Sequence, residues 1–156
     1  MSQAPPQNNV WGPSLWLILH SACERIGSQH LKRLPLEEAR IWFGLLNSLR
    51  YSLPCPQCKK HYTLYSNQTS IMQVTKEAIR RWLFNLHDQV NQRTQKESIP
   101  YESVALQYEA LFNFTEHFKI VTDHMLAAVR RGASISNDVQ RTIRFFTEMK
   151  CFYDFF

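Results

Sequence analysis

Glycine is scarce in this chain, with four among 156 residues, and no apolar run is long enough for a membrane-spanning helix. The shortage of glycine excludes a Gly-rich phosphate-binding loop, and with it a Rossmann-type nucleotide site. Cysteine is also sparse. Only two of the four cysteines lie close together, which argues against a framework of stapling disulfides and favours a redox or metal site.

Strong charge clustering is missing as well. The net charge is +5, but the basic residues form scattered pairs such as Lys59-Lys60 rather than a stripe, which favours solvated helix faces over a nucleic-acid footprint. Residues 1–9 lack the basic start and the apolar stretch of a secretory signal. We therefore predict a cytoplasmic protein that binds neither nucleic acid nor a membrane.

Apolar side chains recur at helical spacing along nearly the whole chain, whereas the alternating pattern of a β-strand is missing. The pattern predicts an all-α protein, and 156 residues suffice for a single domain with its own core. We expect helices at about 14–26, after Pro35, from Ser52–Pro54 to near Asn67, at about 74–95, a short one between Pro100 and Leu111, and at about 116–131 and 136–153.

The motif Cys-Pro-Gln-Cys at 55–58 carries the clearest chemistry, because such a pair cycles between dithiol and disulfide. Ser52 and Pro54 predict a helix start here. Both sulfurs then lie in the first turn, where backbone N–H groups and the helix dipole favour the thiolate. With His61 the pair also supplies three zinc ligands, so a zinc site is the alternative, although no second cysteine pair offers a fourth.

Three separated segments carry further signatures: Trp-x-x-Leu-His at 16–20, Cys-x-x-Cys-x-x-His at 55–61 and His-x-x-Val-Asn at 87–91. In this order they resemble the Erv/ALR family of FAD-linked sulfhydryl oxidases, over about residues 11–108. The resemblance implies a four-helix bundle plus a short fifth helix. The expected organisation is a FAD-binding oxidase domain at 1–110 and a helical C-terminal extension at 111–156, packed on the same domain.

The resemblance also implies the chemistry. Electrons from a protein dithiol would enter at Cys55, the outer sulfur, and pass through Cys58, the inner sulfur, to FAD and then to oxygen, giving hydrogen peroxide. Aromatic faces can stack on the rings of FAD, His and Asn can hydrogen-bond to them, and Lys can offset phosphate charge. The residues that the resemblance assigns to the cofactor are Gly12, Pro13, Trp16, His20, Tyr51, His61, His87, Val90, Asn91, Lys96 and Tyr108. No metal is expected.

The chain departs from the family pattern at several positions. Phe84 and Tyr101 occupy the places of a stapling disulfide found in many cellular members, so that bridge cannot form. Asp88 replaces a usual Asn, and Pro13 stands where many cellular members have Arg. The missing staple and the Trp-Gly-Pro opening at 11–13 are more like virus-encoded members, which predicts action on virion proteins in the host cytoplasm.

Cys23 and Cys151 are single, so the chain has no second pair to relay electrons. Substrate must then reach Cys55 directly, and a thioredoxin-like dithiol carrier is a candidate donor. Cys151 lies among phenylalanines and is expected to be packed and inert. The alternative function is a FAD-free helical interaction module with a structural or zinc-binding cysteine pair.

A homodimer is predicted from two apolar surfaces. Family members are commonly dimers that join through their first helices, and Leu15, Leu19, Ala22 and Ile26 form an apolar stripe there. The tail offers a second surface, because its aromatics exceed what one helix end normally buries. These aromatics are Phe145, Phe146, Phe152 and Phe155.

Overall fold

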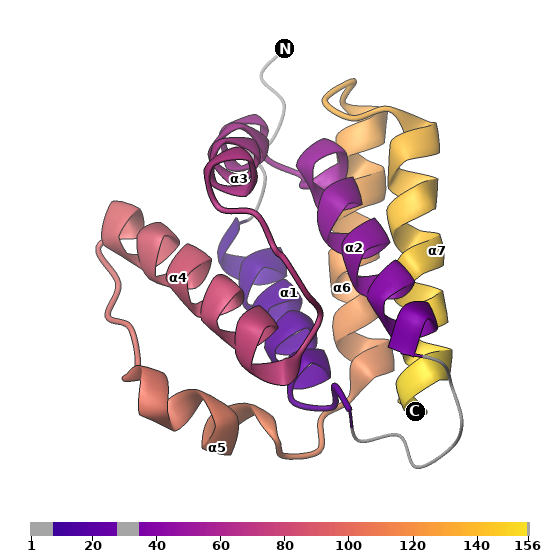
Figure 1. Ribbon diagram of the computed structural model, residues 1–156. Helices are drawn as coiled ribbons and strands as arrows, with labels where there is room; N and C mark the ends of the chain where they lie inside the picture. Colours follow the sequence, from indigo (N-terminus) through magenta and orange to yellow (C-terminus); the bar gives the residue numbers. More distant parts are fainter. Residues whose placement is uncertain (1–7, 28–34, 156) are drawn as a thin grey trace.

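The computed structural model describes residues 8–27 and 35–155 (Figure 1). This part of the chain forms helices and no strand, so the all-α prediction is confirmed. The helices are α1 (Asn8–Cys23), α2 (Pro35–Ser52), α3 (Pro56–Gln68), α4 (Lys76–Thr94), a 3-10 helix (Tyr101–Ser103), α5 (Val104–Tyr108), α6 (Phe114–Arg130) and α7 (Ser136–Tyr153). None of the helices within the described ranges is long and apolar enough to cross a membrane.

The predicted start of α1 is wrong. The helix begins at Asn8 rather than Ser14, and Pro13 lies inside it. Proline lacks the N–H that would bond one turn back, but near a helix start this removes a single bond. The extra turn brings Asn8 toward the redox motif, where its amide nitrogen lies 3.7 Å from the Cys58 sulfur.

The predicted start of α3 also needs correction. Ser52 is the last residue of α2, and its hydroxyl donates to the Ser48 carbonyl at 2.7 Å. The residue that caps α3 is Cys55, whose sulfur accepts a hydrogen bond from the backbone N–H of Cys58 at 3.3 Å. Pro56 follows at the first helical position, where its missing N–H costs nothing.

The helices pack around α1, which lies between α4 and α6 (Figure 1). On the other side of the molecule α2 packs against α3 and α7, and α6 packs against α7. Residues after 111 therefore supply two long helices, of which α6 lies on α1, a helix with a family motif, and α7 lies on α2.

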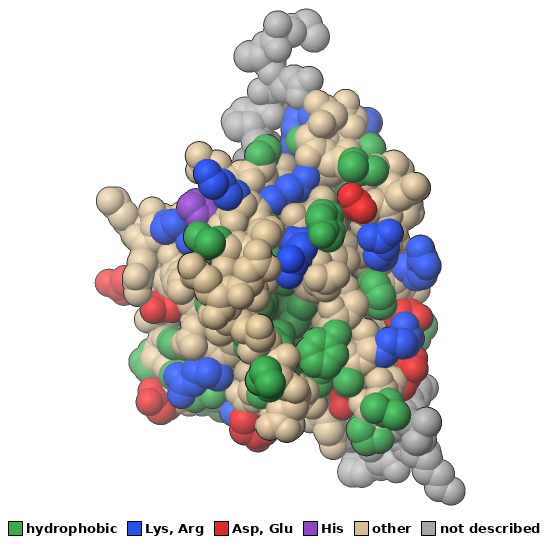
Figure 2. Space-filling model, turned by 45° about the horizontal axis from the view of Figure 1, so that its top comes forward, with side chains coloured by type: hydrophobic (Ala, Val, Ile, Leu, Met, Phe, Trp, Pro, Cys, Tyr) green, Lys and Arg blue, Asp and Glu red, His purple; other side chains and the backbone are tan. Residues whose placement is uncertain are grey.

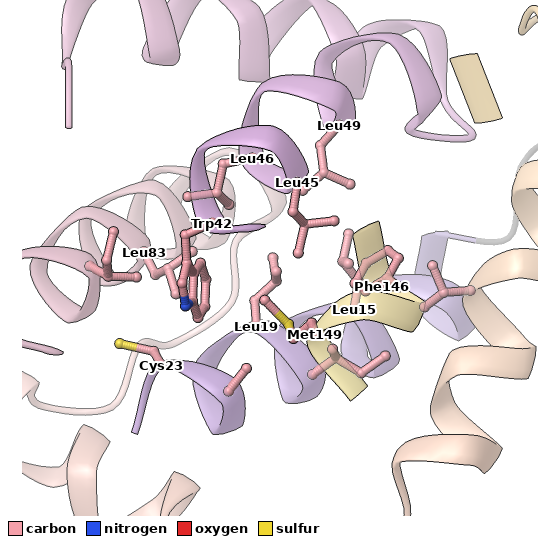
Figure 3. Close-up of a cluster of buried hydrophobic side chains, with 14 of the residues drawn as sticks. Leu15, Leu19, Cys23, Trp42, Leu45, Leu46, Leu49, Leu83, Phe146 and Met149 are labelled. Carbon is pink, nitrogen blue, oxygen red and sulfur yellow. The ribbon is translucent and has the colours of Figure 1, made fainter. Parts of the chain in front are cut away.

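The core joins both parts of the chain. Trp42, Phe146 and Met149 are fully buried, and they meet Leu15 and Leu19 of α1 in one cluster (Figure 3). The indole N–H of Trp42 donates to the Tyr153 hydroxyl at 2.9 Å.

The two apolar surfaces proposed for a dimer are therefore wrong as exposed surfaces. The α1 stripe is buried within one chain, and so are Phe146, Phe152 and Phe155. These side chains pack against helices that are distant in sequence, and such contacts cannot be predicted from the spacing of apolar residues within one helix. The homodimer itself stays a prediction, and it needs another surface.

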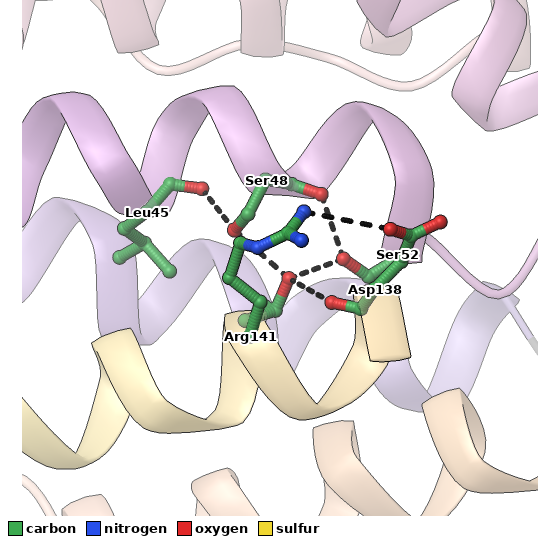
Figure 4. A network of polar contacts seen from close by, with 6 residues as sticks. Leu45, Ser48, Ser52, Asp138 and Arg141 are labelled. Carbon is green, nitrogen blue, oxygen red and sulfur yellow. Dashed lines mark hydrogen bonds and ion pairs between the residues drawn. The ribbon is translucent and has the colours of Figure 1, made fainter. Parts of the chain in front are cut away.

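The α2–α7 contact is close and partly polar. A Cβ atom at Gly44 would clash with the ring of Phe145, so the absence of a side chain at this position lets the ring pack on α2. Further along, the Thr142 hydroxyl lies 2.8 Å from the Ser48 hydroxyl and also hydrogen-bonds to Ser52. Figure 4 shows this network together with the Arg141–Asp138 pair.

Candidate active site

A cavity of about 1020 Å³ opens between α1, α3, α4 and α5, at the upper end of the usual size for small-molecule sites. The predicted residues that line it are Gly12, Pro13, Trp16, Cys55, Cys58, His61, His87, Val90, Asn91, Lys96 and Tyr108. A smaller cavity of about 220 Å³ shares His87, Asn91, Lys96 and Tyr108 and adds His20. Tyr51 lines neither cavity, and its side chain is 48% exposed on α2.

The two cysteines of the motif are chemically unequal. Burial opposes ionisation of Cys55, but hydrogen bonds from the thiol and backbone N–H of Cys58 outweigh it and lower the pKa of Cys55. Burial, together with the neighbouring Cys55, raises the pKa of Cys58 to about 12. The thiolate of the reduced pair is therefore carried by Cys55, at the helix N-cap.

A ladder of flat rings forms the floor of the site where α1 meets α4. Trp16 stacks on His87 with centroids 4.0 Å apart, and His20 stacks on Tyr108 at 4.5 Å. The two histidines share a hydrogen bond of 3.1 Å between Nε2 of His20 and Nδ1 of His87. Burial is the main cause that lowers the pKa of His20 to about 3 and that of His87 to about 4, so both rings are neutral at pH 7.

One polar atom in this ladder is left without a partner. Nδ1 of His20 is buried and makes no hydrogen bond within the described part of the chain. Buried polar atoms are nearly always satisfied, so an orphan beside a cavity indicates a place for a polar ligand atom.

Polar and cationic side chains also line the cavity. Asn91 donates its amide to the Ser98 hydroxyl at 2.9 Å, and Ser98 donates to Asp88 at 2.7 Å. Asp88, the departure from the family pattern, thus ties the segment after α4 back to the helix. Arg93 and Lys96 line the cavity next to this network. Aromatic rings and cations that line one cavity suit a ligand with a flat ring system and phosphates.

An aromatic contact stands where many family members have a staple. Phe84 of α4 meets Tyr101 edge to face with ring centroids 5.2 Å apart. The Arg81 guanidinium lies 3.6 Å from the centroid of the Tyr101 ring. These contacts hold the chain before α5, and therefore Tyr108, against α4.

The zinc interpretation finds no support in the described residues. No three His, Cys, Asp or Glu side chains gather there in a way that could hold a metal ion. His61 lines the cavity instead, and its pKa is lowered by burial and by the charges of Arg93 and Lys60.

The other cysteines lie apart from the site. Cys23 is fully buried and its thiol donates to the Lys76 carbonyl at 3.4 Å, so burial raises its pKa. Cys151 is exposed, and the prediction that it is packed is wrong. It lies on the outer face of α7, because the phenylalanines around it in sequence point inward.

Sequence reasoning missed several residues of the site. Tyr62 is buried beside Cys58 and donates its hydroxyl to the Leu46 carbonyl. Leu86 and Arg93 also line the cavity, and their spacing from Val90 on one face of α4 was a usable signal.

Figure 2 shows the upper face of the molecule. On this face most Lys and Arg side chains lie in the upper half, and most Asp and Glu side chains lie lower. Lys60 and Arg93 place positive charge next to His61 of α3.

Comparison with known proteins finds relatives among viral and cellular sulfhydryl oxidases. An African swine fever virus protein (isolate Tick/Malawi/Lil 20-1/1983), named FAD-linked sulfhydryl oxidase, is 28% identical over 116 residues, covering 70% of this chain and 89% of the relative. A Frog virus 3 protein, inferred to be such an oxidase, is 30% identical over 101 residues, covering 63% of this chain and 65% of the relative.

A more distant relative is the mitochondrial FAD-linked sulfhydryl oxidase ERV1 of Saccharomyces cerevisiae, 26% identical over 92 residues, with 59% of this chain and 47% of the relative covered. No solved structure matches the chain at a comparable significance. The Erv1 / Alr family model matches residues 13–109, a stretch that contains all three motifs. Since that match spans more than half of the sequence, this protein belongs to the Erv1/Alr family.

Proposed function

We propose that this protein is a FAD-dependent sulfhydryl oxidase that converts dithiols in proteins into disulfides. The observation that carries the proposal is the cysteine pair at 55–58, which lines the same cavity as the stacked Trp16 and His87. FAD, when bound, supplies an acceptor for the two electrons of a dithiol and a route to oxygen. Overall, one dithiol and one O₂ give one disulfide and one H₂O₂.

The residues fit this cofactor. The ring ladder presents flat faces for stacking, and the unpartnered Nδ1 of His20 presents a nitrogen for a polar ring atom. Arg93 and Lys96 offer charges that complement a pyrophosphate. This donor set supports the cofactor independently of the relatives' names.

The inequality of the two cysteines suits their proposed roles. A substrate thiolate attacks the Cys55 sulfur of the oxidised pair, and Cys58 leaves. The second substrate thiol then attacks the mixed disulfide and releases Cys55. A thiol of lowered pKa leaves more readily, so the hydrogen bonds to Cys55 favour this release. Two electrons now reside on the pair, beside the cofactor cavity.

The viral relatives support the prediction that the protein is virus-encoded. Action on virion proteins in the host cytoplasm stays a proposal. The substrate side stays a proposal too. Neither Cys23 nor Cys151 lines the cavity, so a protein dithiol, for example of a thioredoxin-like carrier, must reach Cys55 itself.

The deciding experiment is an absorption spectrum of the purified protein, followed by oxygen uptake with dithiothreitol as the probe. We expect flavin bands and one oxygen consumed per dithiol. A colourless protein that consumes no oxygen would favour the alternative, a FAD-free interaction module.

Removing a ring from the ladder is expected to release the cofactor. His87→Ala deletes the stacking partner of Trp16, so the protein should lose most of its FAD. It should also lose stability, about 2.7 kcal/mol where FAD is present at a hundred times its dissociation constant. Bound flavin and thermal unfolding measure both effects. Asn85→Ala, at an exposed position on the same helix, is the control and should change neither. Retention of full flavin in His87→Ala would show that the site is misplaced.

The two single cysteines are expected to be dispensable. Cys23→Ala combined with Cys151→Ser should leave dithiol turnover within a few-fold of the parent, because neither thiol borders the cavity. Steady-state oxygen uptake measures it. Alanine is chosen at position 23 because the site is fully buried. Collapse of turnover in a folded, yellow double variant would make one of them a relay.

A further inference from the structure

The turn between α6 and α7 contacts the segment that carries both redox cysteines. Nη2 of Arg131 donates to the Pro54 carbonyl at 3.0 Å. The Lys59 ammonium donates to the Ala133 carbonyl at 2.5 Å and to the Ser134 hydroxyl at 2.7 Å. The turn therefore hydrogen-bonds to Pro54, just before Cys-Pro-Gln-Cys, and to Lys59, just after it.

The turn is itself a rigid structure. Gly132 has a φ of 79° and donates its N–H to the Val129 carbonyl at 2.9 Å, and Ala133 donates to the Ala128 carbonyl at 2.9 Å. These two hydrogen bonds around a left-handed glycine form the Schellman motif, which ends a helix in one defined geometry. A fixed turn can hold its partner segment in place.

The contacts with the turn also hold the Lys59 ammonium near Cys55. Lys59 interacts electrostatically with Cys55 and with Asp138 at the start of α7, although burial lowers its pKa. From the other side, Arg93 of α4 acts on Cys58. Lys59 thus acts on Cys55 and Arg93 acts on Cys58, while Asp138 faces Lys59, Lys60 acts on the nearby His61, and Arg131 contacts Pro54.

We propose that the α6–α7 turn is a positioning element for the redox pair and that Arg131 is its positioning residue. The turn lies outside the family match at 13–109, so the family motifs alone do not account for it. By holding Pro54 and Lys59, the turn keeps Cys55 at the N-cap of α3, with the hydrogen bonds and the ammonium that favour its thiolate. The effect on turnover rests on the proposed function, whereas the effect on Cys55 reactivity does not.

The test uses the full-length protein, reduced and kept free of oxygen, with iodoacetamide as the probe. The alkylation rate of Cys55 is followed against pH by mass spectrometry of its peptide. In Arg131→Ala the apparent pKa of Cys55 should rise. Its alkylation at neutral pH should fall roughly tenfold, the size expected for losing a hydrogen bond to a charged group. With dithiothreitol, kcat/KM should fall in parallel while bound FAD stays unchanged.

Two variants serve as controls. Arg130→Ala removes the adjacent, exposed arginine and should match the parent. Arg131→Lys keeps a cationic donor for the Pro54 carbonyl and should recover most of the lost reactivity. An alkylation profile of Arg131→Ala that overlays the parent's would overturn the proposal. So would equal losses in Arg131→Ala and Arg130→Ala.

A milder variant covers the case in which Arg131→Ala fails to fold. Ser134→Ala removes one acceptor of Lys59 and should raise the pKa of Cys55 by a smaller amount, whereas an unchanged profile there would count against the turn. If the parent protein contained no flavin and had no oxidase activity, the proposed function would be wrong. In that event, shifted Cys55 profiles in the variants would still support the positioning role.

Discussion

Cys58→Ala is expected to reduce dithiol turnover to background while the protein stays folded and yellow. The variant keeps the ring ladder and the cations of the cavity, so it should keep its FAD. It loses the sulfur that closes the disulfide with Cys55, and without that disulfide no substrate thiol has an electrophile to attack. The drop should exceed about a thousandfold, as for other enzymes that lose a nucleophilic centre. Oxygen uptake with dithiothreitol and anaerobic bleaching of the flavin by the dithiol measure the loss.

Cys151→Ser is the matched control, because it removes a cysteine that lies on the outer face of α7. It should turn over like the parent. Substantial turnover in a yellow Cys58→Ala protein would rule out the assigned pair. A colourless Cys58→Ala protein would mean that the cysteine holds the cofactor site together.

Deleting residues 136–156 is expected to abolish folding rather than to leave a working FAD domain. Val139, Phe146 and Met149 are fully buried against α2 and α1, and large-to-small changes at such positions cost about 2–5 kcal/mol each. The combined loss of these three side chains is comparable with the whole free energy of unfolding of a typical protein, about 5–15 kcal/mol. Far-UV circular dichroism, light scattering and bound flavin should report an aggregated, colourless product.

A point variant separates core packing from chain length. Phe146→Ala should lower the free energy of unfolding by about 3–5 kcal/mol, whereas Phe43→Ala, at a 42% exposed position on α2, should lower it by less than about 1 kcal/mol. A soluble, flavin-binding deletion variant would show instead that the FAD-binding part folds without α7.

Helix boundaries were predictable where the signal is local. The start of α4 follows from Thr75, whose hydroxyl accepts from the N–H of Ala78 at 3.1 Å, and the end of α6 follows from Gly132. The start of α1 was missed because a proline normally opens a helix, and Pro13 does not. Serine is a common N-cap residue, but the hydroxyl of Ser52 hydrogen-bonds instead to a carbonyl of its own helix and to Thr142, which is distant in sequence.

The site was predictable to the extent that its residues belong to linear motifs. Trp16, His20 and His87 come together because the motifs share facing sides of α1 and α4. Tyr51 was placed by resemblance alone, and it points away from both cavities because α2 turns its other face to the core. The contact of Arg131 with the Pro54 carbonyl could not be predicted from the sequence, because any residue can offer a backbone carbonyl as acceptor.

The aromatic join between Phe84 and Tyr101 has a consequence for where the protein can be made. A covalent bridge at this place would have to be oxidised before the segment ahead of α5 was secured, and cytosolic glutathione works against such bridges. Ring packing forms as soon as the chain folds and is indifferent to reductants. The proposed oxidase therefore needs no disulfide of its own to hold the segment before α5 against α4, and a reducing environment would leave this contact intact.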